Sequence, residues 1–324
     1  MRVLGIAGTA KNTGKTTATV SLINNWQNYS RLAVTSIGYD GESKDNVTGL
    51  PKPRLHLPAG VWVVTAEKCL SAGSAGLAVI EFTQQRTPLG RLVVVRVQTP
   101  GLVVLAGPNS ERALKWFIEY LRSRDLEMLI VDGALNRLAP MAAADSLVIS
   151  TGAARNRDLQ ALAAEAEAIE TLMTLPQCEN PRPTLKLGSL LVDQQVPDVL
   201  RQIDSQPLVE FSGIVDSKPL RKLLAKLPGE PAIVLNDSIK LLLSGDLIDT
   251  AALVTNYQGV FQVRKSVQLR AVTVNPFFPR YNEANGQYSP DFVDHQLLLD
   301  LVRDKLQVPV IDVVRQQGAL VATV

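Results

Sequence analysis

A short segment near the N terminus carries the residue types that bind phosphate. Gly14-Lys15-Thr16 closes a loop that begins at Gly8, and an apolar run of strand length, Val3–Ala7, precedes it. Backbone N–H groups of such a loop can surround a phosphate, and the N terminus of a following helix presents partial positive charge to the same anion. We expect Lys15 to contact the β- and γ-phosphates and the Thr16 hydroxyl to coordinate Mg²⁺.

The whole loop is therefore the predicted nucleotide-binding site. Its members are Gly8, Thr9, Lys11, Asn12, Thr13, Gly14, Lys15, Thr16 and Thr17. The alternative is a turn rich in glycine and threonine with a solvated lysine. Lys11 precedes Lys15 by four residues and is expected either at the surface beside the phosphates or in the role that a resemblance to MinD-type NTPases implies. In that branch a lysine five residues before the second one reaches the phosphates of a partner subunit, so the spacing here departs from it by one residue.

Two acidic residues follow predicted strands and are candidate partners of the loop. The apolar run Met128–Val131 ends in Asp132, a Walker-B-like pattern that places a carboxylate near a Mg²⁺ site. Asp40 follows the predicted strand Leu32–Ile37 and is expected to bind Mg²⁺ or to orient water. The alternative is that Asp40-Gly41 simply forms a turn. Together with Thr16, these acids are the predicted metal ligands, and Lys15 and Asp40 are the catalytic candidates.

Composition limits the class of protein. The 324 residues suffice for one large or two ordinary domains, and 46% hydrophobic with 20% charged residues is typical of globular chains. With a net charge of +2 and no dense Lys/Arg block, a nucleic-acid partner is not expected. No apolar run reaches about 18 residues and no signal peptide precedes the first strand, so we expect no membrane span and a cytoplasmic location. Two histidines and two distant cysteines give little support to a zinc site.

Alternating strand and helix patterns predict an α/β fold: a P-loop NTPase three-layer sandwich with a mostly parallel sheet. Pro100-Gly101 predicts a hairpin between Leu92–Val97 and Leu102–Leu105, which would make that sheet mixed. Three prolines in residues 176–183 exclude a helix or central strand there. We therefore predict a nucleotide-binding domain over 1–176 and a smaller C-terminal α/β domain of unknown role over 184–324.

Polar residues at other predicted element ends complete the expectations. Arg137 and Arg155 follow two later strands of the first domain, and each would lie near the phosphate edge or simply at the surface. Asn109 or Ser110 is expected to cap a helix that buries apolar residues of the segment 114–121. Asn236-Asp237 lacks the lysine of a guanine-binding Asn-Lys-x-Asp motif, so ATP is the expected nucleotide.

The loop Gly8–Thr17 resembles that of dethiobiotin synthetases, Gly-Thr-x-x-x-x-Gly-Lys-Thr, because its first glycine lies one residue earlier than in the usual P-loop. Lys11–Thr17 is also similar to the loop of the molybdopterin-guanine-dinucleotide accessory proteins. Both families belong to the class typified by signal-recognition and MinD-type NTPases.

Nearly the whole chain resembles the accessory NTPases encoded beside the cobalamin- and pyridoxal-phosphate-dependent lysine 5,6- and ornithine 4,5-aminomutases. The similar segments are Lys11–Thr16, Thr35–Glu42, Pro51–Pro53, Thr87–Gly90, Ala106–Asn109, Asp132–Ala134 and Val274–Pro276. The resemblance implies a reactivase, a chaperone that uses ATP and Mg²⁺ to release damaged cobalamin from an inactivated mutase. It also implies a protein partner, either the aminomutase or a second reactivase subunit.

Two other functions remain open from the sequence. The loop spacing favours an ATP-dependent small-molecule ligase similar to dethiobiotin synthetase, which activates a carboxylate or carbamate. A P-loop domain can also bind nucleotide without turning it over. A homodimer is compatible with each of these hypotheses.

Overall fold

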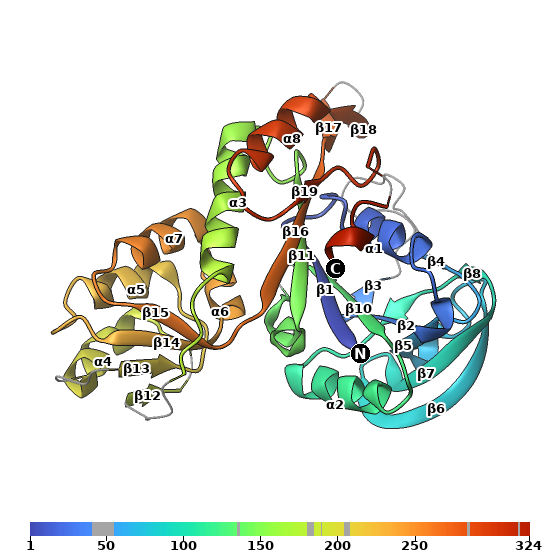
Figure 1. Ribbon diagram of the computed structural model, residues 1–324, viewed down its shortest axis with the longest axis horizontal. Helices are drawn as coiled ribbons and strands as arrows, with labels where there is room; N and C mark the ends of the chain where they lie inside the picture. Colours follow the sequence, from blue (N-terminus) through green and yellow to red (C-terminus); the bar gives the residue numbers. More distant parts are fainter. Residues whose placement is uncertain are drawn as a thin grey trace. The chain divides into compact units, whose positions relative to one another are not determined.

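The computed structural model describes residues 1–40, 55–134, 137–179, 185–188, 190–203, 208–283, 286–316 and 318–324. The side chains of residues 39, 40 and 134 lie outside this description. The chain forms two compact units (Figure 1). Unit 1 comprises Met1–Leu162 and Arg270–Val324, and unit 2 comprises Ala163–Leu269.

Within the described residues, unit 1 is built on a nine-stranded sheet. Its strands, in spatial order, are β19 (Val310–Ile311), β16 (Gln268–Asn275), β11 (Ser146–Gly152), β1 (Arg2–Gly8), β10 (Met128–Ala134), β2 (Leu32–Ser36), β5 (Trp62–Ala66), β7 (Gly90–Thr99) and β6 (Gly76–Thr87). The strand pairs from β11 to β5 are parallel, whereas β7 pairs antiparallel with both β5 and β6. The predicted α/β fold with a large, mostly parallel sheet is confirmed.

Helices cover both faces of the central strands. On one face, α1 (Lys15–Asn24) buries Ala18, Leu22 and Ile23 in the cluster that contains Leu4 of β1. On the other face lies the 3₁₀ helix Ala139–Ala143, and α2 (Glu111–Arg122) packs against that helix. Successive strand residues point to opposite faces. The sheet is therefore the middle of three layers.

The antiparallel edge differs from the predicted hairpin. β7 does not pair with the segment after Pro100-Gly101. It pairs instead with the long strand β6, which precedes it, and Pro88-Leu89 forms the turn between the two strands. The Thr87 hydroxyl accepts a hydrogen bond from the Leu89 N–H and donates one to the Gly90 carbonyl, which closes this turn. The residues beyond Gly101 form two short strands, β8 (Gly101–Leu102) and β9 (Leu105–Ala106), which pair with β4 (His56–Leu57) and β3 (Tyr39–Asp40). The predicted hairpin is therefore wrong, although the sheet is mixed as expected.

The C-terminal part of the chain returns to the large sheet. β16 lies beside β11 (Figure 1), where the Thr273 hydroxyl donates a 2.8 Å hydrogen bond to Ser150 Oγ, and β19 lies beside β16. After β16 the chain forms the antiparallel hairpin β17 (Phe277–Asn282) and β18 (Gln287–Phe292), followed by α8 (His295–Arg303). The predicted single domain over 184–324 is therefore wrong, because Arg270–Val324 belongs to unit 1. The apolar pattern of a strand does not indicate which sheet the strand joins.

Unit 2 contains a parallel four-stranded sheet among its described residues, with strands in chain order. The strands are β12 (Leu185–Leu187), β13 (Leu208–Phe211), β14 (Ala232–Asp237) and β15 (Phe261–Lys265). The helices are α3 (Leu159–Met173), which begins in unit 1, α4 (Val196–Ile203), α5 (Ser217–Leu224), α6 (Ile239–Leu242) and α7 (Leu247–Asn256). None of the described helices, in either unit, is long and apolar enough to cross a bilayer.

The return of β16 makes a testable prediction about unit 1. Ala271 is fully buried in the same cluster as Leu4 and α1. Ala271→Asp places an unpaired carboxyl group there, so we expect the free energy of unfolding to fall by at least about 3 kcal/mol. In a calorimetric melt, the transition should move down by roughly 6 °C or more. Arg270→Asp is the control, because that neighbouring side chain is exposed; equal melts for the two variants would contradict the assigned packing.

Candidate functional site

The loop between β1 and α1 folds closely over the end of the strand. A Cβ atom on Gly8 would lie 2.9 Å from Thr13 Oγ1 and 3.3 Å from the Ala10 carbonyl oxygen, so a larger residue cannot occupy position 8 without displacing the loop. Gly14 precedes the helix with φ 92°, in the left-handed region that favours glycine. These two glycines allow the chain to make a tight turn between the end of β1 and the start of α1.

The N terminus of α1 has no side-chain cap from the described residues. Its N-cap is Gly14, and no side-chain hydrogen bond to the first turn accompanies it. The first N–H groups of a helix lack acceptors within the helix and carry a partial positive charge. Since most helix N-caps supply an oxygen for these donors, a glycine cap leaves the first turn of α1 suited to an external anion.

The predicted loop lysine and the predicted strand carboxylate meet at this point. Lys15 Nζ lies 2.7 Å from Asp132 Oδ2, and both side chains are largely buried, with exposed fractions of 17% and 5%. The contact follows from the sheet, because β1 and β10 are adjacent and parallel with Ile6 opposite Asp132. The pair places one cation and one carboxylate beside the uncapped helix terminus.

Threonine side chains of the loop make contacts within the protein. The Thr9 hydroxyl donates to Thr151 Oγ1 at 3.0 Å, and the Thr9 N–H donates to the Ser150 carbonyl at 2.9 Å, which ties the loop to β11. The Thr13 hydroxyl donates to the Ala10 carbonyl at 3.0 Å and is almost fully buried. Thr9 and Thr13 therefore hold the loop in shape through their hydroxyl groups, and Thr9 does so through its main-chain N–H as well. Their predicted contributions to ligand binding stay predictions.

Asn275 is a site residue that sequence reasoning missed. Its side-chain amide donates a 2.9 Å hydrogen bond to the carbonyl of Asn12, the loop residue with φ 65°. Its side-chain oxygen accepts from the N–H of Phe277, where the hairpin β17–β18 begins. Asn275 belongs to one of the segments that carry the resemblance, but nothing in its spacing placed it against a loop more than 250 residues away. Only the position of β16 beside β11 brings the two together.

Four other predicted residues are placed less completely. Thr16 and Thr17 lie in the first turn of α1 and are half-buried, and Lys11 is exposed at the loop. The main chain of Asp40 is in β3, opposite Leu105, but its side chain lies outside the described residues, as does the segment 41–54 that follows. The metal and catalytic roles predicted for Asp40 therefore stay predictions.

Both predicted arginines follow strands that end at the edge where the loop lies. Arg137 Nη1 is 3.3 Å from the position of a Cβ atom on Gly38, just beyond β2, so it lies near the end of that strand. Arg155 follows β11 and is exposed, and its N–H donates to the Gly152 carbonyl. Both residues therefore follow strands at the carboxyl end of the sheet, and their predicted contacts with phosphate stay predictions.

The site lies where ligands usually bind in open α/β sheets. In the sheet, β10 and β2 lie on one side of β1, and β11 lies on the other side. The chain therefore moves across the sheet in one direction from β1 to β2 and in the opposite direction from β10 to β11. Ligands of such sheets bind outside the carboxyl ends of the strands at the point where the order reverses. The described residues contain no cluster of three or more His, Cys, Asp or Glu side chains that could hold a metal by themselves. A divalent ion here would have to share its ligands with a bound phosphate, as Mg²⁺ commonly does.

Comparison of the chain with family models, with curated proteins and with solved structures found no match. The proposal that the loop binds a nucleotide therefore depends on the geometry of this site.

Asn275 yields a test of how the loop is held. Asn275→Ala removes its hydrogen bond to the Asn12 carbonyl, a bond worth about 0.5–1.5 kcal/mol. We expect amide hydrogen exchange in peptides covering residues 9–14 to accelerate by roughly threefold to tenfold. Asn24→Ala, at the exposed end of α1, is the matched control. Unchanged exchange in the Asn275 variant would show that β16 does not support the loop.

Proposed function

We propose that this protein binds ATP with Mg²⁺ at the loop Gly8–Thr17 and hydrolyses it in support of a partner enzyme. The observation that carries the nucleotide assignment is the Lys15–Asp132 pair, held 2.7 Å apart beside an uncapped helix terminus at the reversal point of the sheet. A cation, a carboxylate and a set of main-chain donors at one point suit a ligand that brings both negative charge and a metal ion.

Several groups of the chain would contribute to the binding of a triphosphate. The N–H groups of the loop and of the first turn of α1 would donate to phosphate oxygens, and Lys15 would turn from Asp132 to the β- and γ-phosphates. Gly8 fits this role because a Cβ there would push into the loop. The hydrogen bonds from the Thr9 hydroxyl to Thr151 Oγ1 and from the Thr13 hydroxyl to the Ala10 carbonyl would keep these donors preorganised, which is how positioning contributes to phosphoryl transfer.

Thr16 and Asp132 would hold Mg²⁺, the first by its hydroxyl and the second by the carboxylate that Lys15 releases. Mg²⁺ prefers oxygen ligands and typically uses one or two carboxylates together with phosphate oxygens and water, so this short ligand set is sufficient. When bound, the ion would neutralise charge that develops on the phosphates. Asp40, which follows β2, remains the proposed residue for orienting water or completing the metal site.

The accessory role rests on the resemblance to the aminomutase-associated NTPases, together with the absence of a recognisable catalytic set among the described residues of unit 2. In this proposal, ATP binding or hydrolysis drives a change that releases damaged cobalamin from an inactivated aminomutase.

The full chain should hydrolyse ATP faster when a cobalamin-dependent lysine or ornithine aminomutase is added. Turnover of a diaminated metabolite by the isolated protein would favour the dethiobiotin-synthetase-like ligase, and binding without any hydrolysis would leave a nucleotide-binding protein.

Lys15 tests the nucleotide assignment. Lys15→Ala removes the cation expected at the β- and γ-phosphates, so we expect ATP affinity to fall at least a hundredfold, about 2.7 kcal/mol. Isothermal titration calorimetry with Mg²⁺ present measures this, and Lys68→Ala, an exposed lysine elsewhere in unit 1, is the control. Full affinity in the Lys15 variant would overturn the assignment.

A second variant separates lost binding from lost folding. Lys15→Ala leaves the Asp132 carboxylate buried without its cation, which commonly costs about 3–5 kcal/mol. Lys15→Met combined with Asp132→Asn removes both charges and should melt closer to the wild type while still failing to bind ATP.

Asp132 tests the metal assignment independently. Asp132→Asn retains an oxygen that can accept from Lys15 Nζ but loses the negative charge that Mg²⁺ requires. We expect ATP affinity without metal to stay within about threefold of wild type, whereas the increase in affinity on adding Mg²⁺ should be largely lost. Titrations with Mg²⁺ and with EDTA provide the comparison, and Asp125→Asn is the exposed control. A wild-type response to Mg²⁺ would remove Asp132 from the metal site.

A further inference from the structure

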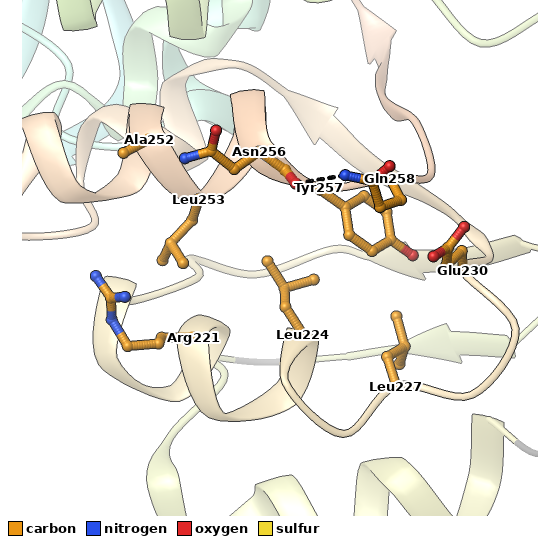
Figure 2. A pocket seen from close by; sticks show the side chains of 9 residues that line it. All are labelled: Arg221, Leu224, Leu227, Glu230, Ala252, Leu253, Asn256, Tyr257 and Gln258. Carbon is orange, nitrogen blue, oxygen red and sulfur yellow. Dashed lines mark hydrogen bonds between the residues drawn. The ribbon is translucent and has the colours of Figure 1, made fainter.

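A cavity of about 370 Å³ opens in unit 2, in a part of the chain that the nucleotide proposal does not use. It lies between α5 and α7, and Figure 2 shows Leu224, Leu227 and Leu253 directed towards it. All three leucines are half-buried, so they form an apolar floor that is reached from solvent. The volume is within the range of small-molecule sites, which combine an apolar lining with a few polar groups.

The two charged residues that line the cavity differ in whether their charge is compensated. The Arg221 guanidinium makes an ion pair with Asp249 of α7, so its charge is met within the protein. The Glu230 carboxylate makes no ion pair with any residue in the described part of the chain. The lining of the cavity therefore presents one uncompensated negative charge.

The Tyr257 ring lies beside Glu230. Figure 2 shows both residues at one end of the cavity and Arg221 at the other. A Cβ atom on Gly259 would lie 2.5 Å from Tyr257 Cε1 and 2.7 Å from the Glu230 carbonyl oxygen, so the ring and the Glu230 main chain pack against the same glycine. The Tyr257 hydroxyl donates a 2.7 Å hydrogen bond to the Pro231 carbonyl, which fixes the orientation of the ring. This aromatic surface is therefore preformed.

The phenol of Tyr257 stays neutral. Burial, and to a smaller extent the negative charge of Glu230, raises the pKa of Tyr257 to about 12. At neutral pH the proton therefore stays on the hydroxyl group, where it is used in the hydrogen bond to Pro231. Glu230 is thus the charged lining residue at this end of the cavity.

Gln258 adds a hydrogen-bond acceptor to the lining. Its side-chain N–H donates to the Asn256 main-chain carbonyl at 3.4 Å (Figure 2), which leaves the side-chain oxygen to accept from another molecule. An ammonium group has three N–H donors and no acceptor, and it is attracted to the face of an aromatic ring. A carboxylate, an amide oxygen and a tyrosine ring together suit such a cation.

We propose that the cavity between α5 and α7 binds a small organic amine in its protonated form. The ammonium group would lie between the Glu230 carboxylate and the Tyr257 ring, and the apolar body of the molecule would cover the three leucines. An anionic ligand would be repelled by Glu230, and a neutral ligand would gain nothing from its charge. The site shares no residue with the nucleotide loop, so either proposal can fail without the other.

The experiment uses the full chain and three ligands with the same apolar body. The probe is phenylbutylamine, and phenylbutanol and phenylbutyrate replace its ammonium group by a neutral and by an anionic group. In a ligand-observed NMR titration we expect saturable binding of the amine with a Kd below about 1 mM, and at least tenfold weaker binding of the other two. Equal affinity for the amine and the alcohol, or no saturable binding of the amine, would overturn the proposal.

Two variants locate the binding site. Glu230→Gln keeps the size of the side chain and removes its charge, so it should weaken the amine at least tenfold and leave the lower affinity for phenylbutanol unchanged. Ala252→Trp, on the α7 side of the cavity, fills the space and should abolish binding of the amine. Both positions are exposed, so both variants should melt as the wild type does.

Glu179→Gln is the matched control, because Glu179 is an exposed acid of unit 2 outside the lining of the cavity. It should bind phenylbutylamine as the wild type does. Undiminished binding of the amine by Glu230→Gln or by Ala252→Trp would contradict the assigned site.

A lysine side chain of another protein carries the same ammonium chemistry and is the alternative source. The peptide acetyl-Gly-Lys-Gly-amide presents that side chain on a polypeptide. We expect it to bind at least tenfold more weakly than phenylbutylamine, because a lysine stem covers less of the leucine floor than a phenylbutyl group does. Binding as tight as that of the amine would show that the cavity receives a protein side chain and would replace the proposal.

Discussion

The ion pair between Lys15 and Asp132 is the interaction on which the account of this protein depends. Two charges removed from water need close and well-oriented partners, so each of these groups restricts the position of the other. Lys15 is the first residue of α1, and Asp132 is near the end of β10. The pair therefore connects α1 to β10, the neighbour of the strand β1 that α1 follows. It also holds the Lys15 ammonium group at the uncapped N terminus of α1.

The rest of unit 1 sets the geometry of that pair. β1 lies between β10 and β11, so the loop that leaves β1 touches a neighbour on each side: Asp132 through Lys15, and Ser150 and Thr151 through Thr9. β16 adds a third support outside β11, where Asn275 bonds to the loop. A sheet of this order concentrates the ends of several strands at one point, which is the usual place for chemistry in α/β folds.

Local chemistry made much of the site predictable. The glycines, Lys15 and the apolar run before Asp132 predicted a strand, a tight loop and a helix, and those elements are present because their signals are local. Ser110 caps α2, accepting from the Ala113 N–H, as its position before an apolar helical pattern indicated. These predictions needed only spacing and side-chain type within a few residues.

The features that sequence reasoning missed depend on long-range pairing. The apolar pattern of β16 is the same whether it extends the second unit or returns to the first, and only packing of Ala271 against the core of unit 1 distinguishes the two. Without that return, Asn275 has no reason to contact the loop. Pro100-Gly101 is a signal for a hairpin turn, but the turn that forms uses the Thr87 hydroxyl and Gly90, whose φ is 102°. Competing turn signals of this kind are decided by the strands that flank them.

The central claim, that the loop recognises phosphate groups, is tested most directly by comparing ligands that share or lack them. Calorimetric titration of the wild-type chain with ATP, tripolyphosphate and adenosine, each with Mg²⁺, separates binding through phosphate from binding through the base. The account predicts saturable binding of one ATP per chain, measurable binding of tripolyphosphate, and affinity for adenosine at least a hundredfold weaker than for ATP. Adenosine binding as tightly as ATP, or no saturable binding of ATP, would contradict it.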